Sequence, residues 1–113
     1  MNQSQWTEEF PAAITVCDRN GIILEMNEMS IRTFSEDGGE KLIGKNLLEC
    51  HPEPARKKLA EMLDTKKKNV YTIEKKGIKK LIFQSPWYKN GIFCGFVEIS
   101  FEIPFDMPHF VRE

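Results

Sequence analysis

The chain has 113 residues, of which 41% are hydrophobic and 29% charged, and a formal net charge of −1. This length fits one domain with a single core, and the composition is that of a folded globular protein, neither disordered nor membrane-embedded. No apolar run approaches the ~20 residues that span a bilayer, and the near-neutral charge gives no reason to expect nucleic-acid binding. The polar N-terminus also lacks the basic start and apolar stretch of a signal peptide.

Cysteine usage favours a reducing compartment. Cys17, Cys50 and Cys94 are odd in number, widely spaced and without a CxxC pair. This pattern argues against a disulfide framework, so we expect a cytoplasmic protein whose cysteines are small buried hydrophobes. No zinc-ligand spacing includes His51 or His109, and no metal site is expected.

Charge is unevenly distributed along the chain. Residues 56–80 contain ten basic and three acidic side chains, which gives this stretch a charge of +7. A one-sided field of this kind can steer an acidic partner. The simpler interpretation is a solvated helix face followed by an exposed hairpin.

The N-terminal part is expected to form an arm and then a β-hairpin. Pro11 ends the arm or short helix, because proline cannot continue a helix. β-Branched residues then flank Asp18-Arg19-Asn20-Gly21. An Asn-Gly pair between two such runs is the strongest short-range hairpin signal, and Gly21 can adopt the positive φ that the turn requires. Strands are therefore predicted over 14–17 and 22–26.

Helical signals fill the middle of the chain. Asn27 is a good N-cap for a short helix over 28–34, and short helical turns over 42–48 are expected to bend at Gly44. A longer helix follows Pro52 and Pro54, which suit a first helical turn. Its apolar stripe follows the i, i+4, i+7, i+8 spacing and comprises Ala55, Leu59, Met62 and Leu63.

From residue 69 the apolar period changes to two, which predicts strands over 70–74, 78–88 and 92–102. Lys76-Gly77 and Asn90-Gly91 are the expected turns, and Pro86 indicates a sheet edge or a bulge. We expect one face of the last strand to carry Phe93, Val97, Ile99 and Phe101. Pro104 ends regular structure and leaves a tail.

The element order and a few residues resemble a PAS domain from Ala12 to Glu102. The loose signature of that family has an acidic residue and a glycine in the first hairpin and an asparagine at the first helix, here Asp18, Gly21 and Asn27. The resemblance implies an α+β fold, with a five-stranded antiparallel sheet and helices inserted between strands 2 and 3. Residues 12–103 would form this domain, between an N-terminal arm (1–11) and a C-terminal tail (104–113).

The resemblance also implies a sensing or interaction module, commonly dimeric, with a ligand pocket between the sheet and the long helix. We expect that pocket to be lined by Leu47, Leu48, His51, Leu59, Leu63, Phe83, Val97 and Ile99. An enzyme is not expected, because the sequence has no Gly-rich phosphate loop, nucleophile elbow or paired-carboxylate motif.

Two cofactors occur in the family, flavin and haem. Flavin photochemistry needs a thiol in a Gly-Arg-Asn-Cys-like motif, and the corresponding residues here are Gly44-Lys45-Asn46-Leu47. Leu47 cannot form the adduct, so flavin photosensing is not expected. Haem-binding members supply an imidazole from the long helix, which has none here, or from the turn before it, which carries His51. His51 is thus a candidate axial ligand, or else a side chain that hydrogen-bonds the helix start.

Three hypotheses result. The leading one is a non-enzymatic sensory or interaction module that binds a small apolar ligand or a signalling protein as a homodimer. The second is a haem-binding gas or redox sensor using His51, and the third a ligand-free dimerisation domain with a filled core. Because the last strands carry apolar residues on both faces, both faces need to be covered. We expect Phe96 and Trp87 to meet Trp6, Phe10 or a second subunit, and we predict dimerisation through the outer face of the sheet.

Overall fold

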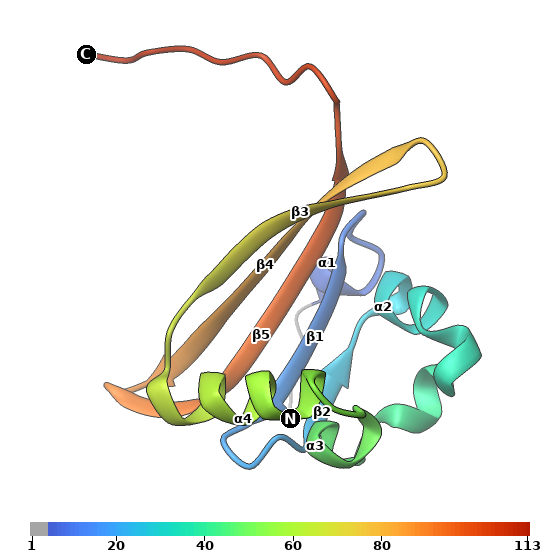
Figure 1. The fold of residues 1–113 in the computed structure, drawn as a ribbon, viewed down its shortest axis with the longest axis vertical. Coiled ribbons are helices and arrows are strands. Elements are labelled where there is room, and N and C mark those ends of the chain that lie inside the picture. Colours follow the sequence, from blue (N-terminus) through green and yellow to red (C-terminus); the bar gives the residue numbers. More distant parts are fainter. Residues whose placement is uncertain (1–4) are drawn as a thin grey trace.

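The computed structural model describes residues 5–113, and they form a single five-stranded antiparallel sheet with helices on one face (Figure 1). The strand order is β2-β1-β5-β4-β3. Its strands are β1 (Ala13–Asp18), β2 (Ile23–Met26), β3 (Asn69–Lys75), β4 (Ile78–Lys89) and β5 (Ile92–Ile103). The helices are α1 (Gln5–Glu8), α2 (Glu28–Thr33), η1 (Ser35–Asp37), η2 (Gly39–Leu42), α3 (Leu47–Cys50) and α4 (Ala55–Thr65). All but α1 lie between β2 and β3 in the chain, so the expected fold class is confirmed.

The side chain of Asp18 stabilises the turn of the first hairpin. Asp18 Oδ1 accepts hydrogen bonds from the N–H groups of Asn20 and Ile22, both at 2.9 Å. Gly21 has a φ of +87°, and a Cβ there would lie 3.2 Å from Asn46 Oδ1. Hydrogen bonding within the turn therefore explains the acidic residue at position 18, and the positive φ explains the glycine at position 21.

Asn27 joins three elements and is the N-cap of α2, as predicted. Its buried side-chain oxygen accepts from the N–H groups of Ser30 (3.0 Å) and Ile14 (2.9 Å). Its amide donates to the carbonyl oxygens of Thr7 and Ala12, both at 2.8 Å. The amide's two donors and both lone pairs of its oxygen are thus used, which fixes the arm, β1 and α2 relative to one another.

The predicted run of helical turns over 42–48 is wrong in its centre. η2 ends at Leu42 and α3 starts at Leu47, with an extended segment between them. The Gly44 N–H donates to the Ile23 carbonyl at 2.8 Å, and the Ile23 N–H donates to the Lys45 carbonyl at 2.9 Å. The segment pairs with the free edge of β2, which satisfies backbone groups that an open edge would expose.

A β-bulge near the last hairpin sets the register of the two long strands. Tyr88 pairs with Phe93, but Trp87 pairs with Gly95, so Cys94 is an extra residue in β5. This is the irregularity that the nearby proline indicated. The grouping of Phe93 with Val97 on one face was wrong, because the extra residue breaks the alternation. Instead, the ring of Phe93 makes an edge contact with that of Phe96, at 6.1 Å between centroids.

The register that the bulge sets determines which side chains lie on each face of the sheet. Directly opposite residues share a face. The inner face, toward the helices, contains the rows Ala13–Ser100–Ile82, Thr15–Glu98–Gln84–Asn69 and Cys17–Phe96–Pro86. The outer face contains Ile14, Ile99, Phe83 and Val70 in one row, with Leu81 and Phe101 beside it. The C-terminal tail leaves the end of β5 and runs away from the domain (Figure 1).

We predict that Gly95→Ala destabilises the fold by about 3 kcal/mol or more, because a side chain there meets both backbone strain and a steric overlap. Gly95 has a φ of +148°, and a Cβ would overlap the Cys17 carbonyl oxygen. Gly44 is the matched control, since it has a φ of +93° with no atom within 4 Å of a Cβ. Gly44→Ala should cost only about 1 kcal/mol. Urea unfolding of both variants measures the difference, and equal costs would contradict the close approach of β5 to β1.

Candidate functional site

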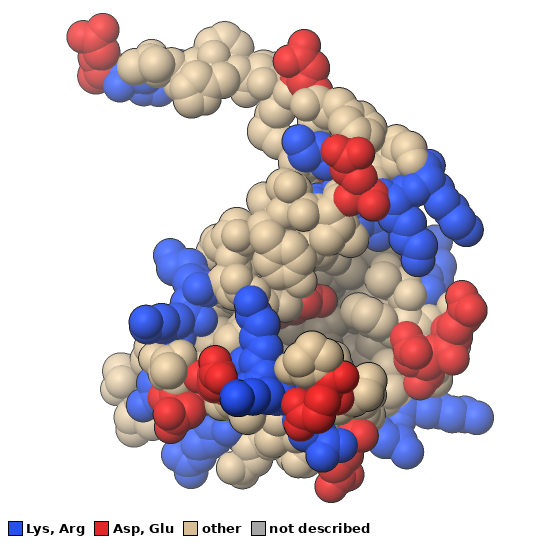
Figure 2. Space-filling view, in the orientation of Figure 1, with Lys and Arg blue, Asp and Glu red and all other residues tan. Residues whose placement is uncertain are grey.

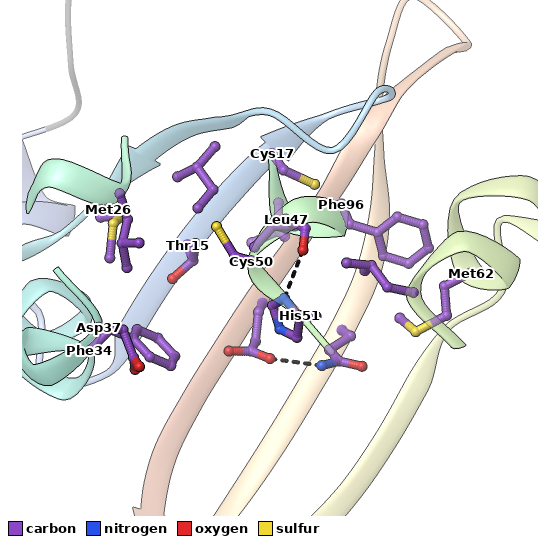
Figure 3. A pocket seen from close by; sticks show the side chains of 16 residues that line it. Thr15, Cys17, Met26, Phe34, Asp37, Leu47, Cys50, His51, Met62 and Phe96 are labelled. Carbon is purple, nitrogen blue, oxygen red and sulfur yellow. Dashed lines mark hydrogen bonds between the residues drawn. The ribbon is translucent and has the colours of Figure 1, made fainter. Parts of the chain in front are cut away.

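A cavity of about 600 Å³ lies between the inner face of the sheet and the helices, within the range typical of small-molecule sites. Figure 2 shows it as a hollow in this face of the molecule, and Figure 3 shows side chains from both layers directed into it. Its apolar lining is Ile23, Met26, Phe34, Leu42, Leu47, Leu59, Met62, Phe96 and Val97. Its polar and thiol lining is Thr15, Cys17, Asp37, Cys50, His51, Gln84 and Glu98.

A row of hydrogen-bonded polar side chains crosses the sheet at the cavity. Asn69 Nδ2 donates to Gln84 Oε1 at 2.9 Å, and Gln84 Nε2 donates to Glu98 Oε2 at 2.7 Å. The first bond fixes which end of the Gln84 amide faces Glu98. In the same row, the hydroxyls of Thr15 and Ser30 share a hydrogen bond of 2.5 Å that ties β1 to α2. The row therefore holds the Glu98 carboxylate in a defined orientation.

Glu98 is only partly satisfied by the protein. Among residues 5–113, Gln84 is its one hydrogen-bond donor, and no Lys or Arg forms an ion pair with it. Its charge reaches across the sheet to Tyr71. The pKa of the Tyr71 phenol is raised, first by burial and then by the negative charge of Glu98. A phenol near a fixed carboxylate thus stays protonated at neutral pH.

His51 follows α3 and lines the cavity as a half-buried side chain (Figure 3). Its Nδ1 lies 2.8 Å from the carbonyl oxygen of Leu47. Because a carbonyl oxygen can only accept, Nδ1 carries the proton, and in the neutral ring Nε2 is the free acceptor. This hydrogen bond anchors the ring to the preceding helical turn, and it also leaves Nε2 in the form that binds metals.

Four of the predicted pocket residues border this cavity, namely Leu47, His51, Leu59 and Val97. Val97 does so between the inward residues Phe96 and Glu98, although its register, opposite Val16 and Ser85, belongs to the outer face. Leu48 and Leu63 are not among its lining residues. They pack against the first hairpin instead, where a Cβ at Gly21 would lie 3.8 Å from Leu48 Cγ and 3.6 Å from Leu63 Cδ1. Part of the apolar stripe of α4 therefore serves contacts between the helices and the hairpin.

The structure places Phe83 and Ile99 on the outer face, away from the cavity. They lie directly opposite each other, one residue along from the inward pair Gln84 and Glu98. Successive side chains on a strand point to opposite faces, so the two pairs cannot share a face. Lys68 Nζ lies 5.8 Å from the centroid of the Phe83 ring.

The residues that the sequence reasoning missed are the inward polar pair and the aromatic beside it, Gln84, Glu98 and Phe96. A signal was present, because Gln84 and Glu98 are polar residues inside otherwise apolar strands. Counting back from the Asn90-Gly91 turn without a bulge pairs Gln84 with Val97. Only the extra residue in β5 brings the two polar side chains opposite each other.

The three cysteines are free and differ in exposure. Burial raises the pKa of the Cys17 thiol above its ordinary value, more than its hydrogen bond with the Phe96 backbone lowers it, and the charge of Asp18 raises it further. Cys50 is exposed and lines the cavity.

Within residues 5–113, no group of three or more His, Cys, Asp or Glu side chains could hold a metal ion. None of the helices described is long and apolar enough to cross a membrane.

Comparisons with known proteins identify the fold. No protein-family model matches the sequence, and no curated protein matches it. Among solved structures, the PAS domain of Bordetella pertussis BvgS is 18% identical with a TM-score of 0.62, covering 87% of this chain and 81% of that one. The chain has a PAS fold. The resemblance inferred from element order is thereby confirmed at the level of the fold.

Two further solved structures are similar to this fold. A C-terminal domain from Streptococcus mutans is 20% identical with a TM-score of 0.69, covering 85% of this chain and 78% of that one. The Aer2 receptor of Vibrio cholerae, described as a dual PAS-haem oxygen sensor, is 16% identical with a TM-score of 0.58, covering 82% of this chain and 95% of that one. Other matches come from sensor histidine kinases.

We predict that Cys50 is alkylated by iodoacetamide at pH 8 well before Cys17, which combines burial with a raised pKa and so presents little thiolate. A rate difference of at least about tenfold is expected, because burial both shields the Cys17 sulfur from the reagent and raises its pKa, whereas Cys50 is exposed. Peptide mass spectrometry over a time course measures it. In 8 M urea, which the experiment adds as its unfolded control, the difference should vanish; faster labelling of Cys17 in the folded protein would contradict the packing.

Proposed function

We propose that this PAS domain is a non-enzymatic sensory module of signal transduction that binds a small, largely apolar molecule in the cavity, in a cytoplasmic setting. The observation that carries the proposal is a preformed cavity of about 600 Å³ with mostly apolar walls and a few convergent polar groups. Such a composition favours ligand binding over chemistry, since no nucleophile–base pair is hydrogen-bonded within the cavity among the residues described.

The comparisons support the class of function and leave the ligand open. Several matching structures are sensor regions of histidine kinases, and one is described as a haem oxygen sensor. These names belong to those proteins, because identities of 14–20% establish a shared fold alone. The ligand hypothesis therefore depends on the cavity of this chain.

Native mass spectrometry of protein purified under non-denaturing conditions tests the proposal. We expect a discrete excess mass that is released on denaturation. Met62→Trp, which places a large side chain from α4 into the cavity, should abolish that mass, whereas Leu24→Trp, at an exposed position of β2, should retain it. If no small molecule is found and Met62→Trp destabilises the fold much more than Leu24→Trp does, the core is already filled, and the third hypothesis of a ligand-free dimerisation domain is favoured.

A second copy of the chain is the partner that we propose for the outer face. That face is an apolar surface across four strands, and no described helix covers it. The tail that follows β5 also exposes four large apolar side chains, Phe105, Met107, Phe110 and Val111, at 54%, 49%, 72% and 82%. Apolar area of this extent on a small domain is typical of an interaction surface.

Analytical ultracentrifugation over a dilution series should show a dimer. Val70→Glu on the outer face should shift the equilibrium toward monomer by at least about tenfold in Kd, because a charge would be buried at the interface. Ile73→Glu is the matched control on the same strand, at 41% exposure against 49% for Val70 but on the opposite face. A monomer at high micromolar concentration, or equal effects of both variants, would contradict this interface.

Haem binding is the second candidate, and the orientation of His51 favours it. The hydrogen bond from Nδ1 to the Leu47 carbonyl leaves Nε2 available as an axial ligand at the cavity. The lining fits the rest of the group less well, because haem carries carboxylates and no Lys or Arg lines the cavity. Bound haem would supply gas or redox sensitivity; the residues described would contribute the imidazole and apolar walls.

Titration with haemin tests this candidate. Binding through His51 predicts a sharp Soret band that His51→Ala removes and His109→Ala in the tail leaves unchanged. If haemin is supplied and its Soret band does not shift, the haem hypothesis is eliminated. The proposal of an apolar ligand is then unaffected.

A further inference from the structure

We propose that the cavity selects ligands that combine an apolar body with a protonated nitrogen group, and that Glu98 receives the nitrogen. This inference rests on the proposed ligand-binding function and assigns the chemical class of the ligand.

The charges that line the cavity have one sign. Glu98 and Asp37 contribute carboxylates, and none of the lining residues is Lys or Arg. Figure 2 shows acidic atoms inside the hollow, while the basic side chains in this view lie outside it. Inside a partly desolvated cavity, like charges repel and opposite charges attract more strongly than they do in water. An anionic ligand is therefore disfavoured.

Glu98 is held in place but not neutralised. Gln84 Nε2 donates to one carboxylate oxygen at 2.7 Å, and Asn69 fixes the Gln84 amide at 2.9 Å. Within the described residues nothing donates to the other oxygen. A half-buried carboxylate with one donor lacks the hydrogen bonds that usually compensate for lost water. A ligand ammonium group would supply both the missing donor and the missing charge, and the protein would need little rearrangement to accept it.

The apolar walls suit the rest of such a ligand. Phe96 lies directly along β5 from Glu98, and Phe34 lies on the opposite wall with Met26 (Figure 3). Aromatic rings attract cations through their faces, and methionine adapts to ligands of irregular shape. The ligand body would pack against these side chains, while its nitrogen reaches the polar row on the sheet.

Three probes with one apolar body test the inference, namely 4-phenylbutylamine, 4-phenylbutan-1-ol and 4-phenylbutanoate. We expect the amine to bind at least about tenfold more tightly than the butanoate, since a charge-assisted hydrogen bond is worth a factor of this size. Glu98→Gln keeps the shape of the side chain and an acceptor for Gln84 but removes the charge. It should weaken the amine about tenfold and strengthen the butanoate. Isothermal titration calorimetry measures each Kd.

Glu102→Gln is the matched control. It removes the same charge from an exposed position on the same strand and face, outside the cavity lining. It should change the amine-to-butanoate ratio by less than about twofold, because exposed charges are screened. Circular dichroism confirms that each variant is folded before the comparison.

Three results would overturn the inference. If the alcohol and the butanoate bind as tightly as the amine, the cavity accepts small ligands without charge selection, and the proposed function survives. If Glu98→Gln and Glu102→Gln lower the affinity for the amine equally, the preference arises from the overall charge of the domain. Binding of none of the probes also contradicts the inference, whereas the proposed function is decided separately by the native mass measurement.

Discussion

The close approach of Gly95 to β1 is the constraint on which the candidate site depends. A Cβ at this position would overlap the Cys17 carbonyl oxygen, so the chain can pass here only as glycine. The indole N–H of Trp87, which pairs with Gly95, donates to the same oxygen at 3.1 Å. The bulge that results moves every later pair of β4 and β5 by one residue. It thereby turns Gln84 and Glu98 toward the helices and leaves Phe83 and Ile99 on the outer face.

Polar side chains make the fold specific at two places, and the two differ in their state of satisfaction. Asn27 is buried and uses all four of its hydrogen-bonding positions within the protein. It therefore acts as a structural anchor between the arm, β1 and α2. Glu98 lies in a similar row but receives one hydrogen bond from the protein. An incomplete polar row beside an apolar cavity is a property of a binding site, since filling it improves both packing and pairing.

The sequence predicted the element order because the determining signals are local. Asn20-Gly21, Lys76-Gly77 and Asn90-Gly91 each mark a tight turn, and the last two have positive φ at both residues. The helical insert followed from the N-cap at Asn27 and from apolar spacing. Together these signals determined the strand boundaries to within one or two residues, and hence the resemblance to the PAS fold.

The faces of the long strands could not be predicted in the same way. The bulge arises from contact between residues some 80 positions apart in the chain, Gly95 and Cys17. Simple alternation grouped Ile99 with Phe93 and Val97 on one face and so assigned it to the pocket, and it gave no reason to exclude Phe83. Similarly, apolar spacing alone suggests that Leu48 of α3 and Leu63 of α4 line the pocket. In the structure both lie near Gly21, so they pack against the first hairpin instead. Four of the eight residues predicted to line the pocket border the cavity, and the inward polar row was not predicted.

The most direct test of this account is the set of intermolecular nuclear Overhauser effects from bound 4-phenylbutylamine. With Glu98 directed into the cavity, the methylene protons next to nitrogen should show contacts to the Glu98 side chain, and the phenyl protons contacts to Phe96 and Phe34. Contacts to Ile99 and Phe83 in their place would mean that the ligand binds at the outer face of the sheet, and would contradict the site built on the inward polar row.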